Sequence, residues 1–316
     1  MNILLTGGTG FIGSLLLPTL LGPSELGGGH RVTVLTRRPA KFSLRHQEAI
    51  ACEQLRVIGT LRELTRDDTY DAIINLAGEG IADKPWTAQR KRELHDSRIT
   101  LTEELVEWIR HVKQKPLVLI SGSAIGWYGN QGDKVLEEGA LPHAEYVHEL
   151  CRDWEQAAAA AEVHGLRVCL LRTGVVIGAG GGMLRKLLPL FGLGLAGPLG
   201  SGQQYLSWVS LTDVVQIILR LLNDNDLHGA FNATGPRPVT NAEFTQTLAR
   251  LLRRPAFLRL PASVLRLAMG EMSTLLLDGQ RVIPCRLLQA RYAFQHASLE
   301  DALRAALSQQ RHVRAD

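Results

Sequence analysis

The chain has 316 residues, of which 45% are hydrophobic and 21% charged, with a formal net charge of +4 and an isoelectric point near 9.0. This composition is typical of a soluble globular protein. The basic residues are scattered, without a basic block that alternates with aromatic residues, so we expect no nucleic-acid partner. No apolar run reaches the length of a membrane span, so we expect no membrane partner either.

The cysteines and the N-terminus bear on the cellular compartment. The four cysteines are far apart and form no CxxC pair, and the histidines lack a third metal ligand at a useful spacing. We therefore expect free thiols and no metal site. The N-terminus lacks the charged and apolar regions of a secretory signal. Together with the free thiols, this favours a cytoplasmic protein.

Short apolar runs alternate with longer segments of helical period along the chain. Strands that are apolar on both faces and separated by helices are typical of a parallel sheet covered by helices on both sides. The pattern predicts strands at residues 2–6, 31–36, 55–58, 71–76, 117–121, 167–173 and 230–233. It predicts helices or amphipathic segments at residues 11–21, 87–112, 144–163, 211–222 and 241–252.

The composition changes after about residue 173, where glycine-rich loops fill residues 174–202. We therefore expect two parts. Residues 1–175 form the sheet domain, to which a later segment of about 203–235 returns. Residues 176–316 form a smaller lobe, within which 261–307 is a helical C-terminal domain. The glycine-rich segment is compatible with a mobile lid and equally with a structural loop.

Gly7, Gly10 and Gly13 have the spacing G-x-x-G-x-x-G, follow the first predicted strand and open the first predicted helix. In this context the glycines permit a tight turn, a close approach of a pyrophosphate and close packing of helix on strand. The helix N-terminus offers free N–H groups to phosphates. A simple strand–turn–helix connection is the alternative. The motif predicts a dinucleotide site in a Rossmann-type α/β fold, a doubly wound parallel sheet with a smaller, mostly helical C-terminal lobe.

Thr36, Arg37 and Arg38 follow the second predicted strand. NAD sites usually place an acidic residue there, which holds the ribose hydroxyls but would repel a 2′-phosphate. A guanidinium can bind that phosphate through two parallel hydrogen bonds and can stack on adenine. The sequence therefore favours NADP(H) over NAD(H), unless the two arginines are simply solvated loop residues.

Four further motifs follow in order along the chain. They are Asn75-Leu76-Ala77-Gly78, Ser121-Gly122-Ser123-Ala124 with Tyr128-Gly129, Leu171-Arg172-Thr173-Gly174-Val175, and Phe231-Asn232. With the glycine loop, they resemble the extended short-chain dehydrogenase/reductase superfamily of the NAD-dependent epimerase/dehydratase type. Over nearly the whole chain, the sequence is similar to the branch called "epimerase family protein", whose members end in a short domain of unknown function. Residues 75–79, 192–202, 204–208, 241–244 and 277–284 carry this closer match.

The resemblance implies a set of cofactor contacts spread over five segments. They are Gly7, Thr9, Gly10, Phe11, Ile12 and Gly13 in the glycine loop, Thr36 and Arg37, Leu76, Ala77 and Gly78, Glu93 and Arg98 on the helix after Trp86, and Val175 at a strand end. Glu93 and Arg98 are five residues apart, so they lie roughly on one side of that helix. Either of the two is alternatively an ordinary surface charge.

In this superfamily, hydride transfer uses a serine, a tyrosine and a lysine, the last two as Y-x-x-x-K. The resemblance implies Ser123 as the serine and Tyr146 as the tyrosine. The fourth residue after Tyr146 is Leu150, so no ammonium favours the phenolate at that register. Tyr146 can still donate a proton as a neutral acid, and Tyr128 is a second candidate. Alternatively, Tyr146 is a helix residue with its hydroxyl in water, and Ser123 is a turn residue bonded to the backbone.

Two functions remain open from the sequence. The first is an NADP-dependent oxidoreductase or epimerase that acts on a small molecule, with a nucleotide-linked sugar as one substrate class, bound by the second lobe. The second is an NADPH-binding protein with little or no turnover that regulates a partner, which the missing lysine favours. The oligomeric state also stays open, with a homodimer as one expectation.

Overall fold

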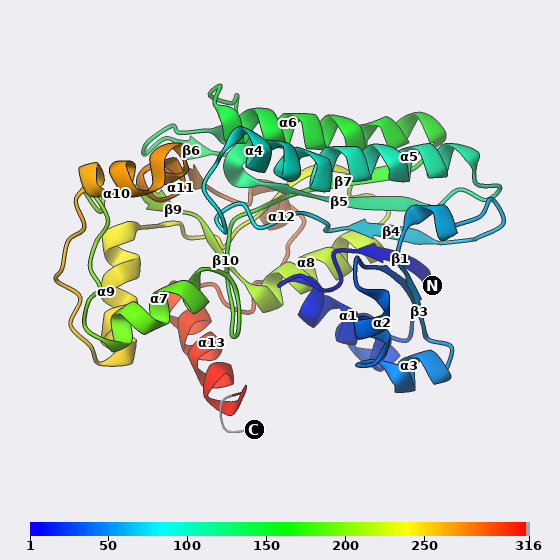
Figure 1. The fold of residues 1–316 in the computed structure, drawn as a ribbon, viewed down its shortest axis with the longest axis horizontal. Coiled ribbons are helices and arrows are strands. Elements are labelled where there is room, and N and C mark those ends of the chain that lie inside the picture. The colour runs from blue at the N-terminus through cyan, green and yellow to red at the C-terminus, as the bar shows by residue number, and fades with distance from the viewer. Residues whose placement is uncertain (314–316) are drawn as a thin grey trace.

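The computed structural model describes residues 1–313, and its centre is a seven-stranded parallel sheet in the order β11-β7-β5-β4-β1-β2-β3 (Figure 1). The strand order reverses between β1 and β4, which is where doubly wound sheets bind their ligands. The Rossmann-type fold class predicted from the sequence is therefore confirmed. The strands are β1 (Asn2–Thr6), β2 (Arg31–Leu35), β3 (Leu55–Ile58), β4 (Ala72–Asn75), β5 (Val118–Ala124), β7 (Arg167–Thr173) and β11 (Gly229–Ala233).

Helices cover both faces of this sheet. α1 (Gly13–Leu21) and α8 (Leu211–Asn223) pack on one face, and α5 (Leu101–His111) and α6 (Tyr146–Ala159) pack on the other (Figure 1). The strand side chains divide accordingly: Ile3 and Leu5 enter the first apolar cluster and Leu4 enters the second. Successive side chains of a strand point to opposite faces, so a strand buried on both faces is mostly apolar. The short helices α2 (Pro39–Ser43) and α3 (Gln47–Ala51) lie beside β3.

The amphipathic segment at 87–112 forms two helices rather than one. Thr87 caps α4 (Ala88–His95) by accepting the Arg90 N–H at 3.1 Å, and a π-helical turn, Asp96–Thr100, separates α4 from α5. Such turns interrupt a regular helix and frequently occur at functional sites. This one carries Arg98.

The second lobe is built on a third apolar cluster around Trp208 and Phe244. It contains α7 (Gly182–Gly192), α9 (Asn241–Leu252), α13 (Leu299–Val313) and the parallel pair β8 (Val175–Ile177) with β10 (Trp208–Ser210). The remaining elements are β6 (Val135–Leu136), which pairs with β13 (Arg281–Val282), β9 (Tyr205–Leu206), which pairs with β12 (Val239–Thr240), and the helices α10 (Ala262–Met269), α11 (Thr274–Leu277) and α12 (Cys285–Gln289). Residues 314–316 of the predicted second lobe lie outside the described residues.

Two boundary shifts matter for the site. The strand predicted at 117–121 continues to Ala124, which brings Ser123 into the sheet. The helix predicted from residue 11 begins at Gly13, so residues 7–12 are all available to the loop that follows β1. Among the described residues, no helix combines the length and the apolar character needed to cross a bilayer.

Candidate functional site

Gly7 and Gly13 bring the end of β1, the end of β4 and the start of α1 close together. Gly7 has a φ of +72°, and a Cβ there would overlap the Leu76 carbonyl and lie 2.8 Å from the Ala77 nitrogen. A Cβ on Gly13 would overlap the Gly7 carbonyl and lie 2.6 Å from the Gly8 Cα. Only glycine tolerates the left-handed backbone at Gly7 and the close separations at both positions. The loop therefore depends on glycine at both positions.

The N-terminus of α1 is open to an anion. No side chain caps it at Ile12, and its first turn contains no acidic residue. Thr9 and Gly10 are exposed, and Phe11 and Ile12 are half-buried. The first N–H groups of a helix lack intrahelical partners, and the positive end of the helix dipole lies there. This cradle fits the pyrophosphate of a dinucleotide.

A glycine-rich segment after β8 packs onto the same loop. A Cβ on Gly178 would lie 3.0 Å from the Phe11 ring, one on Gly182 would lie 2.8 Å from it, and one on Gly181 would overlap it. Val175, the first residue of β8, is half-buried at the other end of that short strand. The glycines after β8 therefore leave space for the Phe11 ring. The sequence pattern did not reveal this contact between segments that are about 170 residues apart in the chain.

Arg37 lies at the carboxyl end of β2, next to a carboxylate. Thr36 is buried, and its N–H donates to the Ile58 carbonyl at 3.0 Å, which fixes the chain as it leaves the sheet. The Arg37 side chain is 87% exposed and forms an ion pair with Glu79. The hydrogen bond from Arg37 holds the pKa of the Glu79 carboxyl below its usual range. The structure thus places an exposed guanidinium where the sequence predicted the 2′-phosphate contact.

Arg90 links Glu79 to Glu93. Its Nη1 lies 3.3 Å from Glu79 Oε2 and 2.8 Å from Glu93 Oε2, and its Nη2 donates to the Gly80 carbonyl at 2.7 Å. The hydrogen bond from Arg90 holds the pKa of the Glu93 carboxyl below its usual range. Glu93 is therefore the outer end of a charged cluster that begins at Arg37.

Arg98 lies against the segment that follows β4. Its Nη2 donates to the Glu79 carbonyl at 2.7 Å, and a Cβ on Gly78 would lie 3.1 Å from its guanidinium carbon. The guanidinium also lies 5.3 Å from the Trp154 ring. Burial lowers the pKa of Arg98. Arg98 thus holds the backbone of Gly78 and Glu79 in place.

Leu76 and Ala77 are fixed to the end of β1. The Leu76 N–H donates to the Thr6 carbonyl at 3.2 Å, and the Ala77 N–H donates to the Thr6 hydroxyl at 3.2 Å. The Thr6 hydroxyl in turn donates to Asn75 Oδ1 at 2.6 Å, and Asn75 Nδ2 donates to Thr102 at 2.8 Å. Residues 76–78 therefore form a fixed rim beside the glycine loop.

Ser123 is bonded to a buried ion pair. It lies opposite Arg172 in the pairing of β5 with β7, and its hydroxyl donates to Glu155 Oε1 at 2.7 Å. Arg172 holds both carboxylate oxygens, with Nε 2.8 Å from Oε1 and Nη2 2.9 Å from Oε2. Its Nη1 donates to Tyr128 at 3.2 Å, whose hydroxyl donates to Asn232 at 2.6 Å. Because Ser123 gives its proton to Glu155, its oxygen remains an acceptor toward other groups.

Tyr146 is the first residue of α6 and has different neighbours. Its ring packs edge-on against Trp86, with ring centroids 5.0 Å apart, and Lys91 Nζ lies 4.2 Å from the Tyr146 ring centroid. Its hydroxyl oxygen is buried and has no hydrogen-bond partner within residues 1–313. Burial raises the pKa of Tyr146, and the charge of Arg98 opposes that shift without cancelling it. Tyr146 is therefore a neutral phenol near neutral pH.

Ser123 and Tyr146 occupy separate environments. Glu155, the partner of Ser123, follows Tyr146 by nine residues and so points to roughly the opposite side of α6. Leu150, at the position of the expected lysine, is buried in an apolar cluster with Trp154. The position where the family has a lysine is therefore occupied by Leu150 and surrounded by apolar side chains.

Sequence reasoning missed Glu155, Arg90 and Glu79 as site residues. Glu155 did leave a signal, because it stands four residues after buried Cys151, on the apolar side of α6. An acidic residue on such a side needs a buried partner. Arg90 and Glu79 left none, since a charged helix and a loop carboxylate are ordinary surface features.

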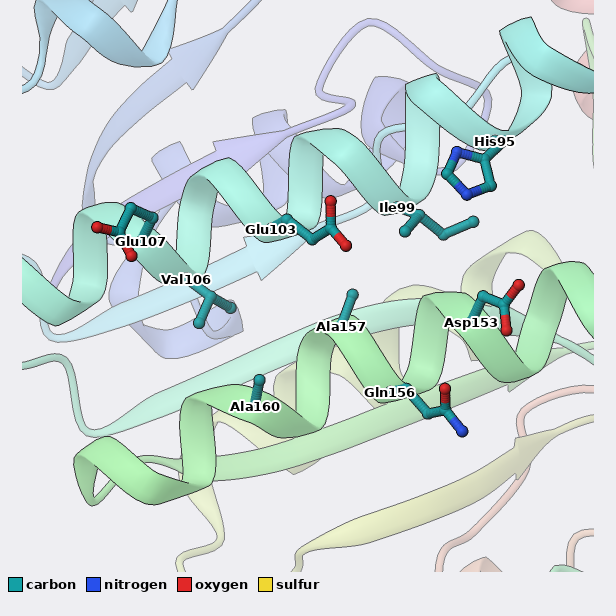
Figure 2. A pocket seen from close by; sticks show the side chains of 9 residues that line it. All are labelled: His95, Ile99, Glu103, Val106, Glu107, Asp153, Gln156, Ala157 and Ala160. Carbon is teal, nitrogen blue, oxygen red and sulfur yellow. The ribbon is translucent and has the colours of Figure 1, made fainter.

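A groove of about 510 Å³ lies between α5 and α6, away from the glycine loop (Figure 2). Its sides include Ile99, Val106 and Ala157, with the carboxylates of Glu103 and Asp153 nearby (Figure 2). It contains none of the predicted site residues. Within the described part of the chain, no group of three or more His, Cys, Asp or Glu side chains is placed to hold a metal ion.

Comparison with known proteins finds two family models that match successive parts of the chain. Residues 3–234 match the NAD dependent epimerase/dehydratase family, and residues 260–306 match a domain of unknown function, DUF1731. The chain is 44% identical over 234 residues to "Epimerase family protein Mb2239" of Mycobacterium bovis, covering 74% of this chain and 77% of that protein. It is 34% identical over 308 residues to the human epimerase family protein SDR39U1, covering 96% and 99%.

Solved structures agree with these sequence matches. Human SDR39U1 (isoform 2), solved with NADPH, superposes with a TM-score of 0.83 at 31% identity and covers 98% of this chain and 99% of its own. A Bacillus cereus UDP-glucuronic acid 4-epimerase solved with NAD has a TM-score of 0.73 at 19% identity, covering 100% of this chain and 98% of its own, which shows the shared fold alone. Sequence and structure therefore identify the chain as a member of the NAD-dependent epimerase/dehydratase family, with a C-terminal DUF1731 domain.

Proposed function

We propose that this chain binds NADP(H) along the carboxyl ends of β1, β2 and β4. The observation that carries the proposal is the exposed guanidinium of Arg37 at the end of β2, where NAD-binding chains usually place a carboxylate. The uncapped N-terminus of α1 supports a pyrophosphate site next to it. The human relative solved with NADPH supports the same cofactor.

In this proposal the contacts divide by cofactor group. The pyrophosphate lies on Gly7, Thr9, Gly10, Phe11, Ile12 and Gly13, the 2′-phosphate on Thr36 and Arg37, and the rest of the cofactor along Leu76, Ala77, Gly78 and Val175. Arg98 acts through the Glu79 carbonyl that it holds next to Gly78, and Glu93 acts through Arg90. Both are therefore positioning residues.

Titration of the purified chain with NADPH and with NADH tests this proposal. We expect tighter binding of NADPH, because NADH has no group for the Arg37 guanidinium. Equal affinity for the two nucleotides would contradict it.

We further propose that the reaction is reduction of a carbonyl on a small substrate, with a nucleotide-linked sugar as the candidate class. When bound, the cofactor supplies hydride. Reduction also needs a proton donor, and Tyr146 is a neutral phenol whose pKa is raised by burial. Epimerisation first needs a base to remove a hydroxyl proton, but Leu150 stands where the family has the lysine that favours the phenolate, and burial raises the pKa of Tyr146. The Ser123 hydroxyl donates its hydrogen bond to Glu155, so its oxygen can accept a hydrogen bond from a substrate hydroxyl.

A second candidate is an NADPH-binding regulatory protein without turnover. The separate environments of Ser123 and Tyr146 favour it, as does the apolar burial of Leu150. NADPH consumption across a panel of carbonyl compounds and nucleotide sugars distinguishes the two candidates. Turnover that is lost in Tyr146→Phe supports the reductase. Tight NADPH binding without turnover on any member of the panel supports the regulatory protein.

A further inference from the structure

One end of the second lobe carries arginines without acidic neighbours in the sequence. Residues 244–270 contain five arginines and no acidic residue: Arg250, Arg253, Arg254, Arg259 and Arg266. Arg250 pairs with Glu300 at 2.8 Å. The other four form no ion pair with any residue of the described chain and lie exposed on the surface. The charge of Arg266 acts on Asp278, where it opposes the rise in pKa that burial causes. Arg253, Arg254 and Arg259 are therefore the three positive charges free to meet an anionic surface.

Large apolar side chains are exposed among these arginines. Leu267 is 91% exposed, Phe257 73%, Leu193 72% and Leu195 57%. Leu258, Leu260 and Val264 are exposed as well. Single exposed apolar residues are common on globular proteins, but a run of them marks a surface that binds something.

Hydrogen bonds join the two segments that carry these side chains. The Leu258 N–H donates to the Ala196 carbonyl at 3.2 Å, and the Leu260 N–H donates to the Pro198 carbonyl at 3.1 Å. Figure 1 shows the connections after α7 and after α9 at the same end of the molecule, next to α10. Residues 193–195 and 253–267 thus form one surface, which we call the basic–apolar face.

We propose that the basic–apolar face binds an anionic lipid surface. Alternating arginine and bulky apolar residues are typical of segments that lie in the membrane interface, where the apolar groups enter the acyl boundary and the guanidinium groups stay with the headgroups. Charge complementarity selects an anionic lipid over a neutral one. An acidic protein would pair with the arginines, but the exposed Phe257 and Leu267 suit the acyl layer of a bilayer. Since no described helix crosses a bilayer, this binding is peripheral.

Co-sedimentation of the full chain with vesicles tests the proposal. We expect binding to phosphatidylcholine vesicles that contain about 30% phosphatidylglycerol and none to pure phosphatidylcholine, with loss of binding at high salt as charges are screened. The double variant Arg254→Gln/Arg259→Gln should lower the partition coefficient roughly 30-fold, at about fivefold for each basic residue near the surface. Phe257→Ser/Leu267→Ser should also weaken binding, by the same factor at every salt concentration at which the unmodified chain still binds.

Matched variants elsewhere on the surface serve as controls. Arg62→Gln/Arg66→Gln removes two exposed arginines from the sheet domain, and Leu141→Ser/Val163→Ser removes two exposed apolar side chains. We expect both controls to bind the vesicles as the unmodified chain does. No sedimentation with the anionic vesicles, or equal losses in test and control variants, overturns the proposal. A dimer that Phe257→Ser/Leu267→Ser dissociates would instead assign the face to a second copy of the chain.

Discussion

Replacing Arg37 by alanine separates cofactor recognition from folding. The Arg37 side chain is 87% exposed, and within residues 1–313 its one ion pair is with Glu79. Exposed ion pairs contribute about 0.2–1 kcal/mol. Hydrogen bonds between charged partners contribute about 1.5–3 kcal/mol. A contact between Arg37 and the 2′-phosphate is therefore stronger than the ion pair with Glu79, with which it competes for the guanidinium. The net loss of NADPH binding in Arg37→Ala is therefore about 0.5–2.8 kcal/mol. This corresponds to roughly 2- to 110-fold weaker binding.

The assay is a titration of NADPH and NADH by calorimetry or by nucleotide fluorescence, at one fixed ionic strength. NADH affinity should not change, because NADH has no 2′-phosphate. Arg45→Ala, which removes an exposed arginine from the turn after α2, is the matched control and should leave both affinities unchanged. A parallel loss of NADPH and NADH affinity, or an unchanged ratio between them, would refute the assignment of the 2′-phosphate to Arg37.

Three further predictions follow from the site geometry. Gly13→Ala should abolish nucleotide binding and lower the melting temperature, because its Cβ would overlap the Gly7 carbonyl; retained binding would show that the loop relaxes without loss. Glu155→Gln should lower the free energy of unfolding in urea by about 3–5 kcal/mol, because it leaves the Arg172 charge buried and unpaired, and adding Arg172→Met should recover most of that loss. If Tyr146 is the proton donor, the rate should stay level up to about pH 10 and fall above it, since the raised pKa keeps the phenol protonated below that pH; a fall between pH 7 and 9 contradicts this.

The order of elements was predictable because it depends on local patterns. Strands that are buried on both faces are mostly apolar, as in residues 72–74, and this pattern is visible without knowledge of their neighbours. The glycine loop was equally visible from its spacing, although only the contacts at Gly13 are local, with Gly7 and Gly8, whereas Gly7 approaches Leu76 and Ala77 after β4. The order of strands and helices along the sequence therefore predicted the correct fold class.

The partners of the chemical side chains were decided by tertiary structure. Whether the Ser123 hydroxyl meets Tyr146 or Glu155 depends on which side of α6 faces β5, and a rotation of the helix exchanges the two. Likewise, the ion pair of Arg37 with Glu79 joins the ends of two strands that are not adjacent in the sheet. The residue types alone reveal neither the orientation of α6 nor the pairing of Arg37 with Glu79.

The sequence by itself thus determined what kind of fold forms and where a dinucleotide can lie, because backbone conformation and burial leave local signatures. Only the tertiary structure decided that Ser123 is bonded to a buried ion pair, that Leu150 is enclosed by apolar groups and that Phe11 packs on distant glycines. These contacts join residues far apart in the chain, and their geometry is set by the packing of whole helices and strands on one another.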